Sequence, residues 1–221
     1  MTIFLAGASR GVGREIAKCL MAQKLTVKAM LRSDKTAPEL QNLGIDQVAI
    51  ADALKPEQIE LAMADSAIES VISTIGGLPE GGDRADYPGN RNLIDAAVKA
   101  GVKKFILVTS IGSGDSAVSL PPQVLQTLGE VLKEKAKAEQ HLINSGLVYT
   151  IIRPGGLKSE PATGNGVLTE DPRIAGTIHR ADVAQLVCRC VGSDRPNYKI
   201  LSALDRTQTY GNSDFAEFQL D

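Results

Sequence analysis

Three glycines directly after the first apolar segment limit what this chain can fold into. Residues 3–6 are typical of a short buried strand, and the seven residues that follow read Gly7-Ala8-Ser9-Arg10-Gly11-Val12-Gly13. A helix-like segment, residues 13–23, comes next. Glycine lets the backbone turn tightly here, and the N–H groups at the start of a helix attract an anion. The alternative is a tight turn without a ligand, but the position after the opening strand favours a loop that holds a pyrophosphate.

Strand-like and helix-like segments alternate along the rest of the chain. The expected strands are residues 25–31, 47–50, 71–75, 105–108, 149–152 and 198–201. The expected helices are residues 38–43, 56–64, 92–100, 180–191 and 123–144, the last with Gly129 as a candidate interruption. This order calls for a parallel sheet that helices cover on both faces. We therefore predict an α/β fold, a Rossmann-like doubly wound parallel sheet in three αβα layers, with residues 1–221 as one domain.

Three less regular segments follow the fourth, fifth and sixth expected strands. They are residues 76–86, 112–122 and 157–177. Open α/β sheets build their sites from loops at the carboxyl ends of the strands. The sequence therefore predicts that the substrate pocket lies among these segments.

Composition excludes several functional classes. The 221 residues carry a net charge of -2, which argues against a large positively charged surface that binds nucleic acid. No apolar run approaches the ~20 residues that a membrane span needs, and no leader pattern precedes the first strand. Three cysteines, Cys19, Cys188 and Cys190, do not suggest a disulfide framework or a metal site. We expect a cytoplasmic protein.

Arg32 indicates which dinucleotide the glycine loop would hold. It follows the second expected strand, about 20 residues beyond the loop, where an acidic residue would accept hydrogen bonds from an NAD ribose. A guanidinium cannot accept these bonds but pairs well with a 2′-phosphate. We expect Arg10 to bind the same phosphate from its other side. The alternative is a solvated surface arginine. The sequence therefore predicts NADP(H) in preference to NAD(H).

Residues after the next two strands are further candidates for the cofactor site. Asp52 and Ala53 follow the third strand, where they would meet the adenine, although Asp52 is equally suited to the start of the helix at Pro56. Thr74 and Gly76 follow the fourth strand, where small residues would let the cofactor pass close to the backbone. Turn chemistry explains Gly76 almost as well.

The glycine loop, Arg32 and three later segments together resemble a known family. The segments read Asn-Leu-Ile-Asp-Ala-Ala at residues 92–97, Phe-Ile-Leu-Val-Thr-Ser at 105–110 and Tyr-Thr-Ile-Ile-Arg-Pro-Gly-Gly at 149–156. They resemble an atypical short-chain dehydrogenase/reductase of the NAD(P)H-binding subgroup that includes biliverdin reductase B/flavin reductase and related plastid and cyanobacterial proteins. The resemblance covers nearly the whole chain.

The resemblance implies roles for residues at the nicotinamide end. Ser110 matches the catalytic serine, and Lys135 matches the lysine that holds the nicotinamide ribose. The alternatives are a loop serine that satisfies backbone groups and a solvated lysine paired with Glu139. Val131 stands in the place of the family tyrosine, so the usual alcohol–ketone chemistry is not expected. Gly156 stands in the place of a histidine of the subgroup's reductase type, which implies a wider pocket with fewer polar groups. The full set of expected cofactor-binding residues is Gly7, Ser9, Arg10, Gly11, Val12, Gly13, Arg32, Asp52, Ala53, Thr74, Gly76, Thr109, Lys135, Pro154 and Gly155.

Three functions are compatible with this reading. The first is an NADPH-dependent oxidoreductase that transfers a hydride to a planar conjugated acceptor, such as a flavin, a quinone or a tetrapyrrole. The second is an NADP(H)-binding redox sensor or assembly factor with little or no catalytic activity. The third, a nucleotide-sugar isomerase or epimerase, is disfavoured by Val131 and by the short C-terminal part. We expect a monomer or a small homo-oligomer.

Overall fold

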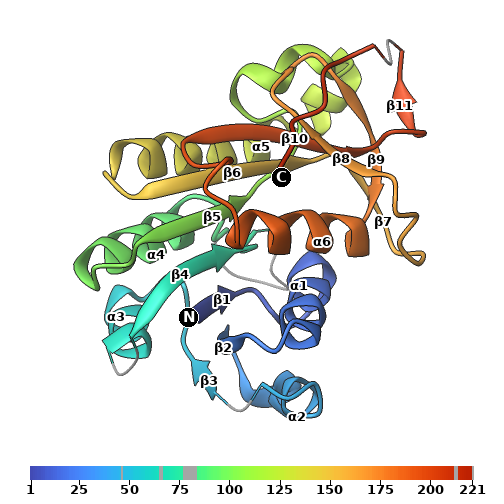
Figure 1. The fold of residues 1–221 in the computed structure, drawn as a ribbon. Helices are drawn as coiled ribbons and strands as arrows, with labels where there is room; N and C mark the ends of the chain where they lie inside the picture. The colour runs from blue at the N-terminus through green and yellow to red at the C-terminus, as the bar shows by residue number, and fades with distance from the viewer. Residues whose placement is uncertain (46, 65–66, 77–83, 212–213, 221) are drawn as a thin grey trace.

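The computed structural model describes residues 1–45, 47–64, 67–76, 84–211 and 214–220, and an eight-stranded sheet forms its centre (Figure 1). The sheet order is β3-β2-β1-β4-β5-β6-β10-β8. The strands are β1 (Thr2–Ala6), β2 (Thr26–Leu31), β3 (Gln47–Ile50), β4 (Ile68–Ser73), β5 (Lys104–Val108), β6 (Val148–Pro154), β8 (Gly166–Thr169) and β10 (Lys199–Asp205). Neighbouring strands are parallel except β8, which runs antiparallel to β10 at the edge. The chain order reverses between β1 and β4, so this point of the sheet is where an open α/β fold binds ligands.

Helices cover both faces of the sheet (Figure 1). One face carries α1 (Gly11–Ala22), α2 (Ala37–Gln41) and α6 (Arg180–Val191), and the other carries α3 (Pro56–Ala64), α4 (Pro88–Lys99) and α5 (Pro122–Asn144). Successive residues of a strand point to opposite faces. Leu5 therefore packs in the core with α1 and α6, whereas Phe4 packs in the core with α3 and α4. The predicted Rossmann-like αβα fold is confirmed.

The expected interruption of the long helix at Gly129 is wrong, because α5 continues from Pro122 to Asn144. No described atom lies within 4 Å of where a Cβ on Gly129 would be. A glycine in an open stretch of helix costs only about 1 kcal/mol relative to alanine, and the rest of α5 outweighs it.

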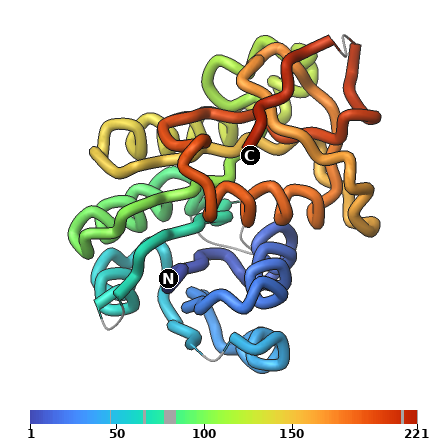
Figure 2. The backbone as a smooth tube through the Cα atoms, in the orientation of Figure 1, coloured from blue at the N-terminus to red at the C-terminus, as the bar shows by residue number. Residues whose placement is uncertain are grey.

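The less regular segment expected at residues 157–177 also contains strands that the sequence did not predict. The chain forms β7 (Gly156–Lys158), β8 and β9 (Ala175–His179) there, and β7, β9 and β11 (Thr209–Tyr210) make a second, three-stranded sheet. All three residues of β7 are exposed, so the strand has no apolar alternation that a sequence could reveal. β7 follows β6 directly, which places the small sheet beyond the carboxyl ends of the main strands, on the same side as the start of α1 (Figure 2).

The two other segments expected to be irregular follow β4 and β5. Residues 77–83 lie outside the described part, and the segment after β5 contains the 3-10 turn η2 (Gly114–Ser119). A second 3-10 turn, η1 (Asp34–Thr36), precedes α2. Within the described ranges, no helix has the length and apolar character that crossing a bilayer requires.

Candidate functional site

The glycine loop is pressed against the end of β4. Gly7 has a φ of +93°, a conformation that favours glycine. A Cβ on Gly13 would lie 2.1 Å from the Gly7 carbonyl oxygen, so only glycine lets α1 start this close to β1. The Thr74 hydroxyl supports the turn, since it lies 3.2 Å from the carbonyl oxygen of Ala6 and 3.3 Å from that of Gly7. The structure thus brings Gly7, Gly13 and Thr74 together, with Thr74 beneath the loop.

The start of α1 is prepared for an anion. Its N-cap residue, Arg10, makes no side-chain capping bond, and the first turn holds no acidic residue. Ser9, Arg10 and Gly11 are exposed, whereas the Val12 side chain is buried in the core. The first N–H groups of a helix have no partner inside the helix, so a phosphate group can accept from them.

Arg32 lies at the same edge of the sheet as this loop. β1 and β2 are parallel with Ala6 opposite Met30, so Arg32 follows β2 where the glycine loop follows β1. Arg10 and Arg32 are exposed, and neither makes an ion pair with a carboxylate in the part of the chain that the structure describes. Both guanidinium groups remain available to a phosphate of a ligand.

Asp52 and Ala53 make local structural contacts. The Asp52 carboxylate accepts a hydrogen bond from the Leu54 backbone N–H at 3.0 Å, and the Asp52 N–H donates to Gln58 Oε1 at 2.8 Å. The Ala53 carbonyl accepts from the Asn92 side chain at 2.9 Å. These contacts match the alternative in which this turn prepares the helix that starts at Pro56.

Lys135 projects from α5 toward the end of β4. Its Nζ forms a 3.0 Å ion pair with the carboxylate of Asp86, a fully buried residue that also pairs with Arg84 at 3.3 Å. A Cβ on Gly76 would lie 2.7 Å from Lys135 Nζ and 2.6 Å from Asp86 Oδ1, so these three residues meet. Lys135 is therefore neither a solvated lysine nor a partner of Glu139. Asp86 is not among the predicted site residues, because nothing in the local sequence signals that it lies beside α5.

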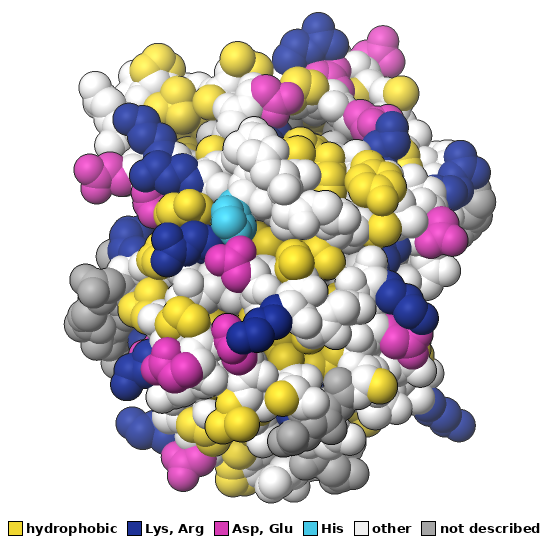
Figure 3. Space-filling view, turned by 90° about the vertical axis from the view of Figure 1, so that its left-hand side faces the viewer, with side chains coloured by type: hydrophobic (Ala, Val, Ile, Leu, Met, Phe, Trp, Pro, Cys, Tyr) yellow, Lys and Arg dark blue, Asp and Glu magenta, His cyan; other side chains and the backbone are white. Residues whose placement is uncertain are grey.

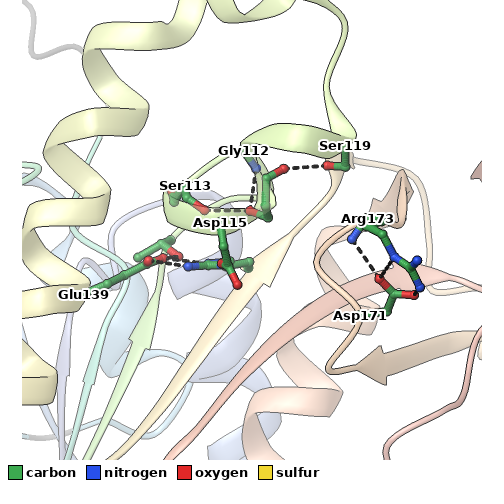
Figure 4. Close-up of polar contacts among 10 residues, drawn as sticks. Gly112, Ser113, Asp115, Ser119, Glu139, Asp171 and Arg173 are labelled. Carbon is green, nitrogen blue, oxygen red and sulfur yellow. Dashed lines mark hydrogen bonds and ion pairs between the residues drawn. The ribbon is translucent and has the colours of Figure 1, made fainter.

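A second buried ion pair holds the turn after β5. The Arg153 guanidinium donates from Nε and Nη2 to the two carboxylate oxygens of Glu139, at 3.0 and 2.7 Å, and from Nη1 to Asp115 at 2.5 Å. Burial opposes its charge, but hydrogen bonds and attraction from Glu139 and Asp115 raise the pKa of Arg153 above the ordinary value. Figure 4 shows Glu139 beside the Gly112–Ser119 segment, which contains η2.

Ser110 and Thr109 lie within the turn that this pair holds. The Thr109 hydroxyl donates to Glu139 at 2.6 Å, so this side chain serves the buried network. The Ser110 hydroxyl is half-buried and donates to the Ile111 carbonyl at 3.0 Å. In this conformation Ser110 satisfies a backbone group, and a bound ligand would compete for its proton.

Pro154 and Gly155 mark the end of β6. Pro154 is buried, and the Gly155 N–H donates to the Ala203 carbonyl at 2.9 Å. A Cβ on Gly155 would lie 2.3 Å from the Gly176 carbonyl oxygen, so close packing against β9 accounts for this glycine. The structure thus gives Gly155 a role in joining the two sheets.

Comparison with known families identifies the family of proteins to which this chain belongs. A model described as NAD(P)H-binding matches residues 7–194. The chain is a member of this NAD(P)H-binding family. Two observations fit a dinucleotide phosphate at the glycine loop: Gly7, Gly11 and Gly13 carry no side chain there, and the first turn of α1 carries no acidic residue that would repel a phosphate.

Similar proteins include several named as reductases. ChuY from Escherichia coli O157:H7, described as an anaerobillin reductase, is 33% identical with a TM-score of 0.84, over 93% of this chain and 97% of that one. Sanguinarine reductase from Eschscholzia californica is 31% identical over 84% of this chain and 82% of its own length. The chloroplastic protein TIC 62 of Oryza sativa is 32% identical over 93% of this chain, which spans 46% of the length of that relative. The family members similar to this chain support an oxidoreductase in general terms.

One further side chain beside the glycine loop was not among the predicted residues. Arg180, the first residue of α6, has its Nε 3.7 Å from where a Cβ on Gly11 would be. α6 follows the small sheet, far from the glycine loop in sequence, so only the packing of α6 beside α1 reveals this neighbour.

The opposite side of the molecule differs from this site. Figure 3 shows acidic and basic side chains interspersed there, with small apolar groups between them. Ion pairs between exposed side chains include Lys99–Glu60 and Lys103–Glu69, at 2.5 and 3.5 Å. Such a mixed surface gives no extended field of one sign on the residues drawn in colour.

Proposed function

We propose that this protein is an NADPH-dependent reductase of a planar conjugated acceptor such as a flavin, a quinone or a tetrapyrrole. The main support is that a chain of the NAD(P)H-binding family also has polar side chains held in place by ion pairs and hydrogen bonds near the ends of β4 and β5. Lys135 is 16% exposed and held by Asp86, and Ser110 lies in the turn that Glu139 and Arg153 anchor. ChuY and sanguinarine reductase, both named as reductases, give the proposal its reaction class.

Arg32 and Arg10 support NADPH in preference to NADH. Both are exposed beside the glycine loop, and a 2′-phosphate would receive charge-assisted hydrogen bonds from them. When bound, reduced nicotinamide supplies a hydride. The protein's own contribution is to bind and orient: Lys135 would hold the ribose, and the Ser110 hydroxyl would donate a hydrogen bond to the acceptor or to the carboxamide.

The acceptor class follows from the side chains near this edge. Val131 has no proton to give, so an acceptor that takes a proton from water suits the site better than a ketone does. Exposed apolar side chains stand in the segments after β5 and β6: Val118 in η2 is 73% exposed and Leu157 in β7 is 40% exposed. A flat apolar ligand would cover such side chains favourably.

A single assay tests this function. Purified protein is mixed with NADPH and, in turn, FMN, FAD, a quinone and biliverdin, and the loss of nicotinamide absorbance is followed. We expect turnover with at least one acceptor and a reduction of about tenfold in kcat for Ser110→Ala, since a hydrogen bond to a reacting group is lost. Ser119→Ala, which removes a hydroxyl bonded within η2, is the matched control and keeps its rate. Tight NADPH binding without turnover of any acceptor would contradict the proposal and favour a redox sensor or assembly factor.

A further inference from the structure

The guanidinium of Arg180 lies over the glycine loop. Its Nε is 3.7 Å from where a Cβ on Gly11 would be, and Gly11 is the exposed residue at which α1 begins. α6 runs alongside α1, and both helices start at the carboxyl side of the sheet (Figures 1 and 2). The fold therefore brings a positive side chain to the exposed residue at which α1 starts, where helical N–H groups have no partner inside the helix.

The partners of Arg180 are neutral. Nη1 donates to the Ser159 hydroxyl at 2.7 Å and to the Leu157 carbonyl at 3.4 Å. None of the described carboxylates forms an ion pair with this guanidinium. A guanidinium has five N–H donors, and the bonds to Ser159 and Leu157 use only one of its nitrogens. The positive charge and the remaining donors are left for a ligand on the Gly11 side.

A diphosphate is the anion that fits this combination. The start of a helix and a guanidinium both favour phosphate oxygens, and a guanidinium can bind two oxygens at once. We propose that Arg180 binds the diphosphate of the NAD(P)H cofactor, whereas Arg32 binds the 2′-phosphate. This inference adds a residue to the cofactor site of the proposed function. It rests on the family match, which is the evidence that the chain binds NAD(P)H.

The contacts of Arg180 also join the two ends of the site. Leu157 belongs to β7 and Ser159 follows it, and β7 comes directly after β6 on the side proposed for the acceptor. The same guanidinium therefore spans from the cofactor loop to the small sheet. Removal of the Ser159 hydroxyl should weaken diphosphate binding less than removal of the guanidinium does, because it loosens Arg180 without removing its charge.

The test measures binding of three ligands without any acceptor. NADPH carries both groups, ADP-ribose carries only the diphosphate, and 2′-AMP carries only the 2′-phosphate. For Arg180→Gln we expect about a tenfold loss of affinity for NADPH and ADP-ribose, the size expected for a charged hydrogen bond, and unchanged affinity for 2′-AMP. Arg32→Ala should show the reverse pattern, with ADP-ribose unchanged. Ser159→Ala should lose about twofold with ADP-ribose.

Controls separate binding from folding. Arg189→Gln removes an exposed arginine from the other end of α6 and should leave all three affinities unchanged. Arg180→Lys keeps the charge and should retain part of the ADP-ribose affinity even if Arg180→Gln lowers stability. Unchanged ADP-ribose binding in both Arg180 variants, or equal losses for 2′-AMP and ADP-ribose, would overturn the assignment. Because no turnover is measured, a negative result here is distinct from a lack of reductase activity.

Discussion

The carboxyl ends of the strands form one edge of the main sheet, and its two halves, around β1 and β2 and around β4, β5 and β6, are built differently. Around β1 and β2, the backbone makes the site: Gly7 and Gly13 shape the loop, and the charges near it are exposed arginines without described carboxylate partners. Around β4, β5 and β6, buried ion pairs make it: Lys135 with Asp86 and Arg153 with Glu139. The first half keeps its charge for a ligand, whereas the second uses charge internally to fix side chains. Affinity should therefore depend on the first half, and stability and alignment on the second.

The largest effect is expected from breaking the buried pair in the second half. Arg153→Met leaves Glu139 buried without its cation, which should lower the free energy of unfolding by about 3–5 kcal/mol in urea titrations. The control is Arg173→Met, which removes an exposed partner of Asp171 (Figure 4) and should cost at most about 1 kcal/mol. Equal losses in the two variants would show that the Arg153 pair does not hold this half together.

The next effect tests the first half through its backbone. In Gly13→Ala, the new methyl group meets the Gly7 carbonyl oxygen and pushes α1 away from β1. Overpacking of this kind costs about 1–3 kcal/mol, and we expect a loss of NADPH affinity of up to about 100-fold in titration calorimetry. Gly129→Ala is the control, since its methyl group enters open space on α5 and should leave binding unchanged. Wild-type affinity in Gly13→Ala would refute the importance of the close approach.

A smaller effect concerns the exposed charge of the first half. Arg32→Ala should reduce the preference for NADPH over NADH by about tenfold, because one charged hydrogen bond to the 2′-phosphate is lost. Dissociation constants for both nucleotides give the ratio. Lys35→Ala, at another exposed cation just after β2, should not change it. Equal affinities of the wild type for NADPH and NADH would contradict the assignment of Arg32.

The smallest expected effect is a change in the pKa of Cys19, at the contact between α1 and α6. A hydrogen bond with Cys188 lowers the pKa of Cys19 to about 7; partial burial opposes this, and a bond from Gln23 adds to it. A lowered pKa means that the reactive thiolate persists to lower pH, so iodoacetamide labelling of Cys19 should reach half its maximal rate near that pH. Burial raises the pKa of Cys190 to about 12, and this thiol should stay unlabelled. In Cys188→Ala, the Cys19 midpoint should move up toward that of an ordinary thiol, and an unmoved midpoint would contradict the contact.

The comparison also explains which parts the sequence could predict. The strand, glycine loop and helix at residues 2–22 were predicted because glycine spacing and apolar periodicity act over a few residues. The pairing of Lys135 with Asp86, and the place of Arg180 above Gly11, come from elements that are distant in sequence and meet only through packing. β7 and β11 escaped prediction because strands of three and two residues, none of them fully buried, are too short to carry an alternating pattern. The roles of Ser110 and Lys135 came from the family resemblance and stay predictions.

The single helix α5 carries both anchors of the second half, and this limits how such a chain can change its length. Lys135 and Glu139 lie about one turn apart, and one faces the end of β4 while the other faces β6. One residue inserted between Glu139 and the end of α5 would rotate both by about 100° if that end stayed in register with its neighbours. Residues 122–131 contain no buried side chain, so the start of α5 can tolerate gains and losses. Relatives of this chain should therefore differ in length at that exposed start and keep a constant spacing from Lys135 to the end of the helix.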